Sequence, residues 1–340
     1  VAVDTLVSGN LSCSLHKKEA EVILFDMSPP SLEVPEGIAF LKGEIREYAQ
    51  VENCGHWHGL CFHSSYGMSV RDQLNRKLIE EVNVQGTEHV LRACVEAGVS
   101  RLVYTSTFNL VFGGQDIEGG DESLPYLPLH LHPDHYSRIK SVAEMAVMKD
   151  SGTELKDGTG VLRACALRPA GIYGPGEQRH LPRIVRYIEK GIFCFVYGDP
   201  RSLVEFVHVD ILVSPHELAA EALMSEHQHR TAGQAYFISG GRPVNNFEFF
   251  RPLVEDLGYS FPKLHLALSL IYFVAFLTEM IHHLFGPIYN FQPLLTRTEV
   301  YKTVVTHDEA QGQGFTLQRL MLDVLLLVAL ALSYLPVVGS

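Results

Sequence analysis

Residues 101–140 read RLVYTSTFNLVFGGQDIEGGDESLPYLPLHLHPDHYSRIK, and this stretch decides the fold. Its first seven residues form a short apolar run ending in hydroxyl side chains, which is typical of a buried strand that stops at a sheet edge. A helical pattern follows from Ser137 to Lys149. A strand, a connection and a helix in this order predict one unit of a parallel α/β sheet.

The same unit recurs on both sides of this stretch. Short apolar runs alternate with amphipathic stretches over roughly the first 200 residues, the pattern of successive βαβ units. Residues 73–97 have the periodicity of a long helix. We therefore predict an α/β fold with a doubly wound, Rossmann-like parallel sheet and helices on both faces. The other predicted strands are VILF at 22–25, AFL at 39–41, GLCFH at 59–63 and LRACALRP at 162–169.

The pattern loosens after Arg168, which predicts a division into parts. Residues 1–170 would form the dinucleotide-binding domain, and residues 171–310 a smaller C-terminal substrate lobe over the carboxyl edge of the sheet. The predicted strands of the lobe are 193–197, 206–208 and 236–238, and its predicted helices lie near 181–189, 211–224 and 246–257.

An apolar C-terminal segment is predicted at residues 318–340. Residues 320–338 read LMLDVLLLVALALSYLPVV, close to the about 20 apolar residues that cross a bilayer. A second stretch, LHLALSLIYFVAFLTEMIHHLF at 264–285, has an uninterrupted apolar core of only about 12 residues. That length favours a buried or interfacial helix over a spanning one.

Composition limits the classes of partner. The net charge of −12 argues against nucleic acid, because no basic stripe is available to neutralise phosphates. The balance favours a hydrophobic small molecule or a membrane. The six cysteines include no CxxC pair, so we expect buried free thiols and no metal site.

A tyrosine and a lysine stand four positions apart at the start of the predicted helix. Tyr136 and Lys140 would share one helix face, and the ammonium would lower the phenol's pKa from its ordinary value of about 10. Such a pair also arises by chance on exposed helices. Here Ser106 and Thr107 end the preceding strand, where a hydroxyl can hold a substrate oxygen while the tyrosine moves its proton.

The region around Asp26 bears on the cofactor. Asp26 ends the strand at 22–25, and an acidic residue there binds adenosine ribose hydroxyls and favours NAD over NADP. A glycine-rich pyrophosphate loop should lie about 20 residues earlier, at residues 1–9. Only Gly9 remains there in VAVDTLVSG, and Asp4 would oppose the pyrophosphate charge. Unless VAV supplies it, a first strand is missing, which would expose neighbouring strand edges.

Three stretches together carry a resemblance to a known family. They are residues 101–140, ALRPAGIYGPGEQ at 166–178 and GDPRSLVEFVHVD at 198–210. They resemble extended short-chain dehydrogenase/reductases of the 3β-hydroxysteroid dehydrogenase type, most closely family 42E. The resemblance covers the chain from Leu11 to Thr306.

The resemblance implies roles for particular residues. Tyr136 would be the general acid/base, and Lys140 would lower its pKa and bind the nicotinamide ribose of NAD. Thr107 would take the family's Ser/Thr position, with Ser106 as its neighbour and alternative. The backbone at 169–171, which is Pro169, Ala170 and Gly171, would contact the nicotinamide carboxamide. Arg168 is interpreted as support for that turn, and NVQGT at 83–87 as helix packing.

These expectations lead to three hypotheses. The first is an NAD-dependent oxidoreductase acting on a hydroxyl or ketone of a hydrophobic substrate, a sterol or steroid. The second is a membrane-attached, non-catalytic relative unable to bind dinucleotide. The third, less favoured because of the apolar C-terminal segment, is a nucleotide-sugar epimerase. We expect attachment to the endoplasmic reticulum membrane with the catalytic domain facing the cytosol, and the sequence is compatible with a homodimer.

Overall fold

The computed structural model describes residues 5–29, 33, 35–54, 59–64, 75–113, 117, 120–177 and 181–285. The predicted apolar segment at 318–340 lies outside the described residues, as does the VAVD part of the predicted pyrophosphate loop. Within the described ranges, no helix is both long and apolar enough to cross a membrane.

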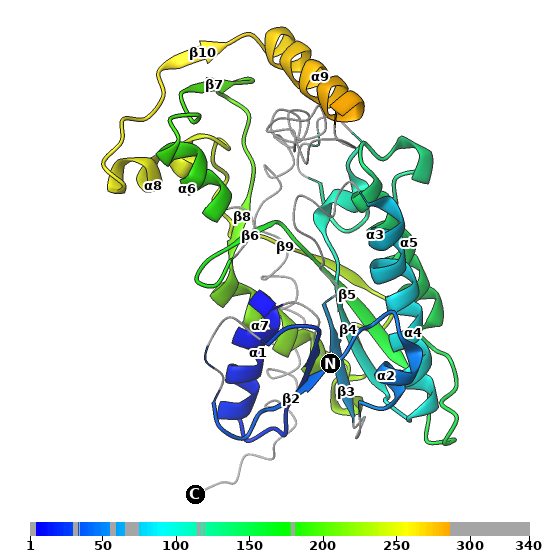
Figure 1. Cartoon of the computed structure of the whole chain (residues 1–340). Coiled ribbons are helices and arrows are strands. Elements are labelled where there is room, and N and C mark those ends of the chain that lie inside the picture. Colours follow the sequence, from blue (N-terminus) through cyan, green and yellow to red (C-terminus); the bar gives the residue numbers. More distant parts are fainter. Residues whose placement is uncertain are drawn as a thin grey trace, which may run out of the picture.

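A four-stranded parallel sheet forms the centre of the molecule (Figure 1). In this sheet Tyr104 pairs with His63 on one side and with Ala166 on the other. Because all four strands are parallel, their carboxyl ends meet at one edge. In spatial order the strands are β3 (Leu60–His63), β4 (Arg101–Thr105), β5 (Arg163–Pro169) and β9 (Ala235–Ile238).

Helices cover both faces of this sheet, so the predicted doubly wound, Rossmann-like fold is confirmed (Figure 1). Side chains alternate along β4: Leu102 and Tyr104 pack on one face, and Val103 packs on the other. The first face is covered by α4 (Gly86–Glu96) and α5 (His135–Asp150), and the second by α1 (Thr5–Lys17) and α7 (Val209–Ala222).

The first two predicted strands form a separate parallel pair, β1 (Ile23–Asp26) with β2 (Ala39–Lys42). Among the described strands, none joins β1 to β3. The predicted loop position of Gly9 needs correction, because Gly9 lies buried inside α1, which already begins at Thr5. Beyond the first four residues of a helix, backbone N–H groups bond within the helix, so the Gly9 amide is not free for a pyrophosphate.

The long helix predicted at 73–97 is present from Arg76 onward with a local change of pitch. It runs through α3 (Arg76–Glu80), a π-helical turn η2 (Glu81–Gln85) and α4. Gly86 packs against α2 (Tyr48–Glu52) and the residues before it, and a Cβ added there would lie 2.8 Å from Cγ2 of Ile45. The interpretation of residues 83–87 as a packing motif is therefore confirmed.

Within the described residues, the smaller lobe contains two short parallel strand pairs and three α-helices. Aromatic side chains fill it: Phe206 stacks on Phe249 with 3.7 Å between ring centroids, and Phe193 contacts Phe261. The pairs are β6 (Gly171–Tyr173) with β8 (Phe206–His208) and β7 (Phe195–Tyr197) with β10 (Leu264–Leu266), and the helices are α6 (Leu181–Glu189), α8 (Arg251–Asp256) and α9 (Leu268–Phe285).

The chain crosses between the two predicted parts more than once after residue 170. After leaving the sheet at β6, it returns through α7 and then β9, which pairs with β5. The reason is burial: α7 and β9 carry apolar side chains that complete the core on the α1 face.

The short helical turns are η3 (Phe108–Val111), η4 (Leu129–Leu131), η5 (Ser225–His227) and η6 (Glu248–Phe250).

The contact between Gly86 and Ile45 can be tested by a double-mutant cycle. Gly86→Val forces side-chain atoms into Ile45, and we expect about 1–3 kcal/mol of destabilisation from overpacking. In the Ile45→Ala background the same substitution should cost less, because the space is then available. Urea unfolding of the four proteins measures both costs, and strict additivity would contradict this packing.

Candidate active site

Tyr136 and Lys140 lie on the first turns of α5, which approach the carboxyl edge of the sheet. The helix begins here because Asp134 caps it: Oδ1 accepts the Ser137 N–H at 2.9 Å and Oδ2 accepts the Ser137 hydroxyl at 2.6 Å. Tyr136 is half-buried, whereas Lys140 is only 1% exposed. The four-residue spacing puts both side chains on the helix face that meets the sheet.

The Lys140 ammonium is held at the end of β4. Its Nζ donates a hydrogen bond to the carbonyl oxygen of Thr105 at 2.9 Å, and it lies 4.3 Å from the centroid of the Tyr104 ring. A cation over an aromatic face is attracted by the ring's electron density. These contacts fix a buried positive charge where the predicted chemistry requires one.

The two predicted hydroxyls both lie buried at this edge but differ in their bonds. Thr107 Oγ1 accepts a hydrogen bond from the N–H of Asn109 at 3.4 Å and caps η3. The Thr107 O–H can therefore still donate a hydrogen bond. The Ser106 N–H donates to the Leu167 carbonyl at 2.7 Å. The Ser106 hydroxyl is buried with no hydrogen-bond partner among the residues that the structure describes.

His63, at the end of β3, belongs to the site although no sequence motif pointed to it. Thr87 Oγ1 donates to the Asn83 carbonyl at 2.6 Å, so the 2.9 Å contact between Thr87 and His63 Nε2 must be a donation from the imidazole. His63 Nδ1 is then an acceptor, with no partner within the described part of the chain. Burial and the Lys140 charge hold the pKa of His63 well below its ordinary value.

A second histidine fixes β4 from the opposite face of the sheet. His216 of α7 contacts the Leu212 carbonyl through Nδ1 at 2.8 Å, so Nδ1 carries the proton and Nε2 accepts the Thr105 hydroxyl at 2.8 Å. Burial lowers the pKa of His216 to about 4, which keeps the ring neutral at pH 7. Thr105 is thus held by Lys140 from one side and by His216 from the other.

A buried ion pair joins α5 to β5. Arg168 donates to Glu144 Oε1 from Nη2 at 2.6 Å and from Nε at 3.0 Å. The Tyr126 hydroxyl donates to the same oxygen at 2.8 Å. Arg168 and Glu144 are almost completely buried, so Arg168 ties β5 to α5 one residue before the predicted turn.

The predicted nicotinamide turn at 169–171 offers few backbone amides. Pro169 has no N–H, and the Ala170 N–H donates to the Ile238 carbonyl at 2.9 Å, so neither can offer an amide proton to a cofactor. A Cβ on Gly171 would lie 2.9 Å from Cδ1 of Phe206. Glycine is therefore needed there for packing of β6 on β8.

Asp26 stands at the carboxyl end of β1, as predicted. Its Oδ1 accepts the N–H of Ser28 at 3.0 Å. Burial raises the pKa of Asp26, and the amides of Ser28 and Met27 partly offset this rise. The carboxylate is held by short-range backbone contacts and remains half-buried.

The carboxyl edge has the polar groups that a dinucleotide would need. His63 Nδ1, Ser64 Oγ and Ser106 Oγ are buried acceptors or donors without partners among the described residues, and unpaired buried polar atoms are rare without a ligand or water. They follow β3 and β4, where ligands of doubly wound sheets bind. For a metal, the described residues offer no cluster of three or more His, Cys, Asp or Glu side chains.

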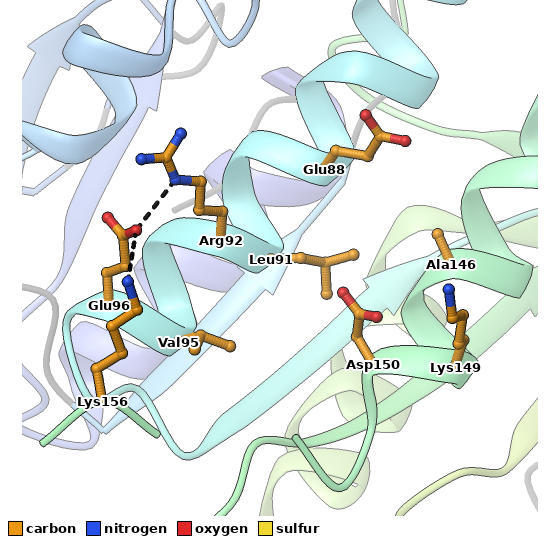
Figure 2. A pocket seen from close by; sticks show the side chains of 9 residues that line it. All are labelled: Glu88, Leu91, Arg92, Val95, Glu96, Ala146, Lys149, Asp150 and Lys156. Atoms are coloured by element: carbon orange, nitrogen blue, oxygen red, sulfur yellow. Dashed lines mark hydrogen bonds and ion pairs between the residues drawn. The ribbon is translucent and has the colours of Figure 1, made fainter. Parts of the chain in front are cut away.

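A separate hollow of about 440 Å³ lies between α4 and α5 on the outside of the molecule (Figure 2). It contains neither Tyr136 nor Lys140 and is bordered by an ion-pair group, in which Glu96 accepts Arg92 Nε at 3.1 Å and Lys156 Nζ at 3.2 Å. The hollow is therefore distinct from the site at the sheet edge. Its lining residues are Glu88, Leu91, Arg92, Val95, Glu96, Ala146, Lys149, Asp150 and Lys156.

The sequence of this chain is similar to those of known proteins. The model of the 3-beta hydroxysteroid dehydrogenase/isomerase family matches residues 16–268. The chain belongs to this family. Similar members include short-chain dehydrogenase/reductase family 42E member 1 of Danio rerio, 63% identical over 97% of this chain and 94% of the relative. The human protein of the same name is 65% identical over 87% of this chain and 76% of its own.

Other proteins resemble this chain less closely, either in sequence or in fold alone. The Arabidopsis thaliana 3beta-hydroxysteroid-dehydrogenase/decarboxylase isoform 1 is 36% identical over 77% of this chain and 58% of that protein. A dTDP-glucose 4,6-dehydratase from Streptomyces venezuelae, solved with NAD, superposes with a TM-score of 0.63 at 23% identity over 78% of this chain and 83% of that one. At that identity the likeness shows the fold alone.

The buried Arg168–Glu144 pair predicts that a conservative substitution of Glu144 strongly destabilises the fold. Glu144→Gln keeps the side-chain shape but leaves the Arg168 charge buried without compensation, and we expect about 3–5 kcal/mol of destabilisation. The matched control is Glu248→Gln, which breaks an exposed pair with Arg251 and should cost about 1 kcal/mol or less. Equal effects in urea unfolding would show that the buried pair is not a structural constraint.

His216 predicts a pH dependence of stability. Its pKa is about 4 in the folded protein, against an ordinary value of 6.5. The unfolded chain therefore binds more protons between these values, so stability falls as the pH is lowered from about 6.5 toward 4. His216→Gln should reduce that slope by up to one proton, whereas His130→Gln, at an exposed position, should not. Unfolding free energies measured at several pH values give this slope for each protein. An unchanged slope in His216→Gln would contradict this role of His216.

Proposed function

We propose that this family member is an NAD-dependent oxidoreductase that exchanges a hydride with a hydroxyl or ketone of a hydrophobic substrate, a sterol or steroid. The observation that carries the proposal is the position of the Tyr136 and Lys140 helix face against the end of β4. There the buried Lys140 ammonium bonds to Thr105, and the Ser106 and Thr107 hydroxyls follow at once. A tyrosine, a lysine and a hydroxyl at one sheet edge suit proton transfer at a carbonyl or alcohol oxygen.

Each of these residues would have a distinct task. In oxidation, the proton of the substrate hydroxyl moves to Oη of Tyr136, and in reduction the same atom returns it. The Lys140 charge favours the phenolate form of Tyr136. The Thr107 hydroxyl, whose oxygen already accepts the Asn109 amide, would donate a hydrogen bond to the substrate oxygen and orient it. When bound, the nicotinamide would supply or accept the hydride.

Asp26 supports NAD as the cofactor. A half-buried carboxylate at the end of β1 would accept the adenosine ribose hydroxyls and repel a 2′-phosphate. Lys140, together with the polar atoms of His63 and Ser106 that have no partner among the described residues, would hold the nicotinamide half at the sheet edge. The dehydratase of similar fold was itself solved with NAD, which is compatible with this choice.

The substrate class rests on the family and on composition. The Arabidopsis relative is named for a 3β-hydroxysteroid substrate, and the chain is 46% apolar. The non-catalytic alternative is less favoured, because Lys140 and both hydroxyls lie at one edge and Tyr136 lies one turn before Lys140 on α5. Attachment to the endoplasmic reticulum membrane, a cytosolic catalytic domain and a homodimer stay predictions.

The catalytic assignment can be tested by separating binding from turnover. NADH titration, followed by energy transfer or thermal stabilisation, should give saturable binding that Lys140→Met abolishes. Tyr136→Phe should retain NADH binding but lose about 100-fold or more in turnover of a 3β-hydroxysteroid. Absence of any response at millimolar NADH would overturn the proposal, as would full activity of Tyr136→Phe.

The cofactor assignment makes a separate prediction. Asp26→Ser removes the carboxylate that would oppose a 2′-phosphate, so the ratio of NADPH to NADH affinity should rise about tenfold or more, equivalent to about 1.4 kcal/mol. Asp199→Ser, an exposed aspartate in the lobe, is the matched control and should leave the ratio unchanged. An unchanged ratio for Asp26→Ser would exclude Asp26 from cofactor choice.

A further inference from the structure

Helix α1 is held in place along its whole length. In a doubly wound fold the amino end of the first helix receives the pyrophosphate of a dinucleotide. Val7 and Leu11 of α1 are 1% and 3% exposed and pack in the core against the sheet. Beyond them, Ser14 Oγ donates to Glu217 Oε1 at 2.7 Å and Lys18 Nζ donates to Glu217 Oε2 at 2.8 Å. The first turn of α1 therefore cannot change its register without disturbing these contacts.

This register puts residues with side chains where a dinucleotide-binding helix has glycines. In the pattern G-x-G-x-x-G the last glycine lets the first turn of the helix pack closely on the sheet, and the buried Ser8, 4% exposed, has that place in α1. Asp26 then follows about 20 residues later, as the pattern requires. Counted back from Ser8, the other two glycine positions hold Val3 and Thr5, and Gly9 comes one position too late.

Residues with a Cβ at these positions weaken the contact between a pyrophosphate and the backbone. The first four N–H groups of a helix have no acceptor within it, and with α1 beginning at Thr5 they are the donors that a phosphate would use. Glycine permits close approach of a ligand to such donors. One hydrogen bond to a charged group is worth about a tenfold change in an equilibrium or more. In the sequence, Asp4 adds a negative charge next to Thr5.

The two ends of the same cofactor site keep their polar groups. Asp26 stands at the carboxyl end of β1, in the place that binds the adenosine ribose. At the ends of β3 and β4, the Lys140 ammonium is fixed on Thr105. His63 Nδ1 and Ser106 Oγ are buried there without partners among the described residues. Contacts for the two nucleosides are thus present, whereas those for the phosphates between them are weakened.

We propose that this chain binds its nicotinamide cofactor by the two nucleoside ends, with little of the binding free energy coming from the pyrophosphate. This inference rests on the function proposed above, because it concerns the same cofactor site. It has a consequence for ligand choice: reduced nicotinamide riboside, which has no phosphate, makes all the contacts that the nicotinamide end offers.

The experiment restores the glycine pattern in the full-length chain. The glycine variant combines Val3→Gly, Thr5→Gly and Ser8→Gly with Asp4→Ser, which removes the neighbouring charge. Lys17→Gly, at the exposed opposite end of α1, is the matched control for added helix flexibility. Each protein is titrated with NADH and with reduced nicotinamide riboside, and binding is followed by the fluorescence of the reduced nicotinamide. Circular dichroism checks the fold.

We expect the glycine variant to bind NADH at least about tenfold more tightly than the unaltered chain, the gain of one hydrogen bond to a charged group. Its affinity for reduced nicotinamide riboside should change less than about twofold, because that ligand has no phosphate for the backbone to hold. The Lys17→Gly control should bind both ligands as the unaltered chain does.

The salt dependence of the unaltered chain is a second test that needs no variant. The screening length falls from about 10 Å at 0.1 M salt to about 3 Å at 1 M, and salt screens the attraction of a helix amino end for an anion. We expect the dissociation constant of NADH to rise less than about twofold over this range, because the pyrophosphate is not held.

The outcomes separate this inference from the proposed function. An NADH affinity that the glycine substitutions leave unchanged would overturn the inference, as would an equal gain for NADH and reduced nicotinamide riboside. A dissociation constant of NADH that rises more than about fivefold with salt would also overturn it, whether or not the glycine variant folds. If the unaltered chain responds to neither ligand at millimolar concentration, the proposed function itself fails.

Discussion

The buried pair of Arg168 and Glu144 is the constraint on which the site depends. Two charges taken out of water cost several kcal/mol each unless they meet in good geometry, and here two guanidinium nitrogens and one phenol converge on a single carboxylate oxygen. Glu144 lies one turn after Lys140, and Arg168 immediately precedes Pro169. The pair therefore sets the position of the Tyr136 helix face relative to the turn that leaves β5.

The end of β4 is the second fixed point of the site, and the histidine rings beside it are neutral. The Lys140 ammonium and the His216 ring both bond to Thr105, from opposite faces of the sheet. Because burial depresses the pKa values of His63 and His216, neither ring competes with the lysine as a positive charge near neutral pH. A cation in a poorly solvated setting acts strongly on a phenol that approaches it, and the role proposed for Tyr136 depends on this effect.

Sequence patterns predicted the parts of this molecule that depend on neighbouring residues. The apolar run of β4 and the four-residue spacing of Tyr136 and Lys140 are local, so β3, β4, β5, the helix from Arg76 to Glu96 and the helix that carries this pair were predicted close to their positions. Three features were not. Gly9 was assigned to a loop because spacing was counted from Asp26, although α1 already includes it. The return of β9 to β5 and the bonds of His63 and His216 join residues far apart in the chain, and no local pattern reports such contacts.

The pairing of β9 with β5 has a consequence for how the protein folds. Ala235 pairs with Ala166 across the whole connection that builds much of the smaller lobe, so this edge of the sheet has a high contact order and its closure must wait for a long loop to be ordered. During synthesis from the amino terminus, α5 and β5 emerge long before β9. The edge of β5 beside the future site then stays open until Ile238 has emerged, and a chaperone or a stray strand could occupy it. Completion of this sheet edge is thus a late event, because it waits for the synthesis of the chain between β5 and β9.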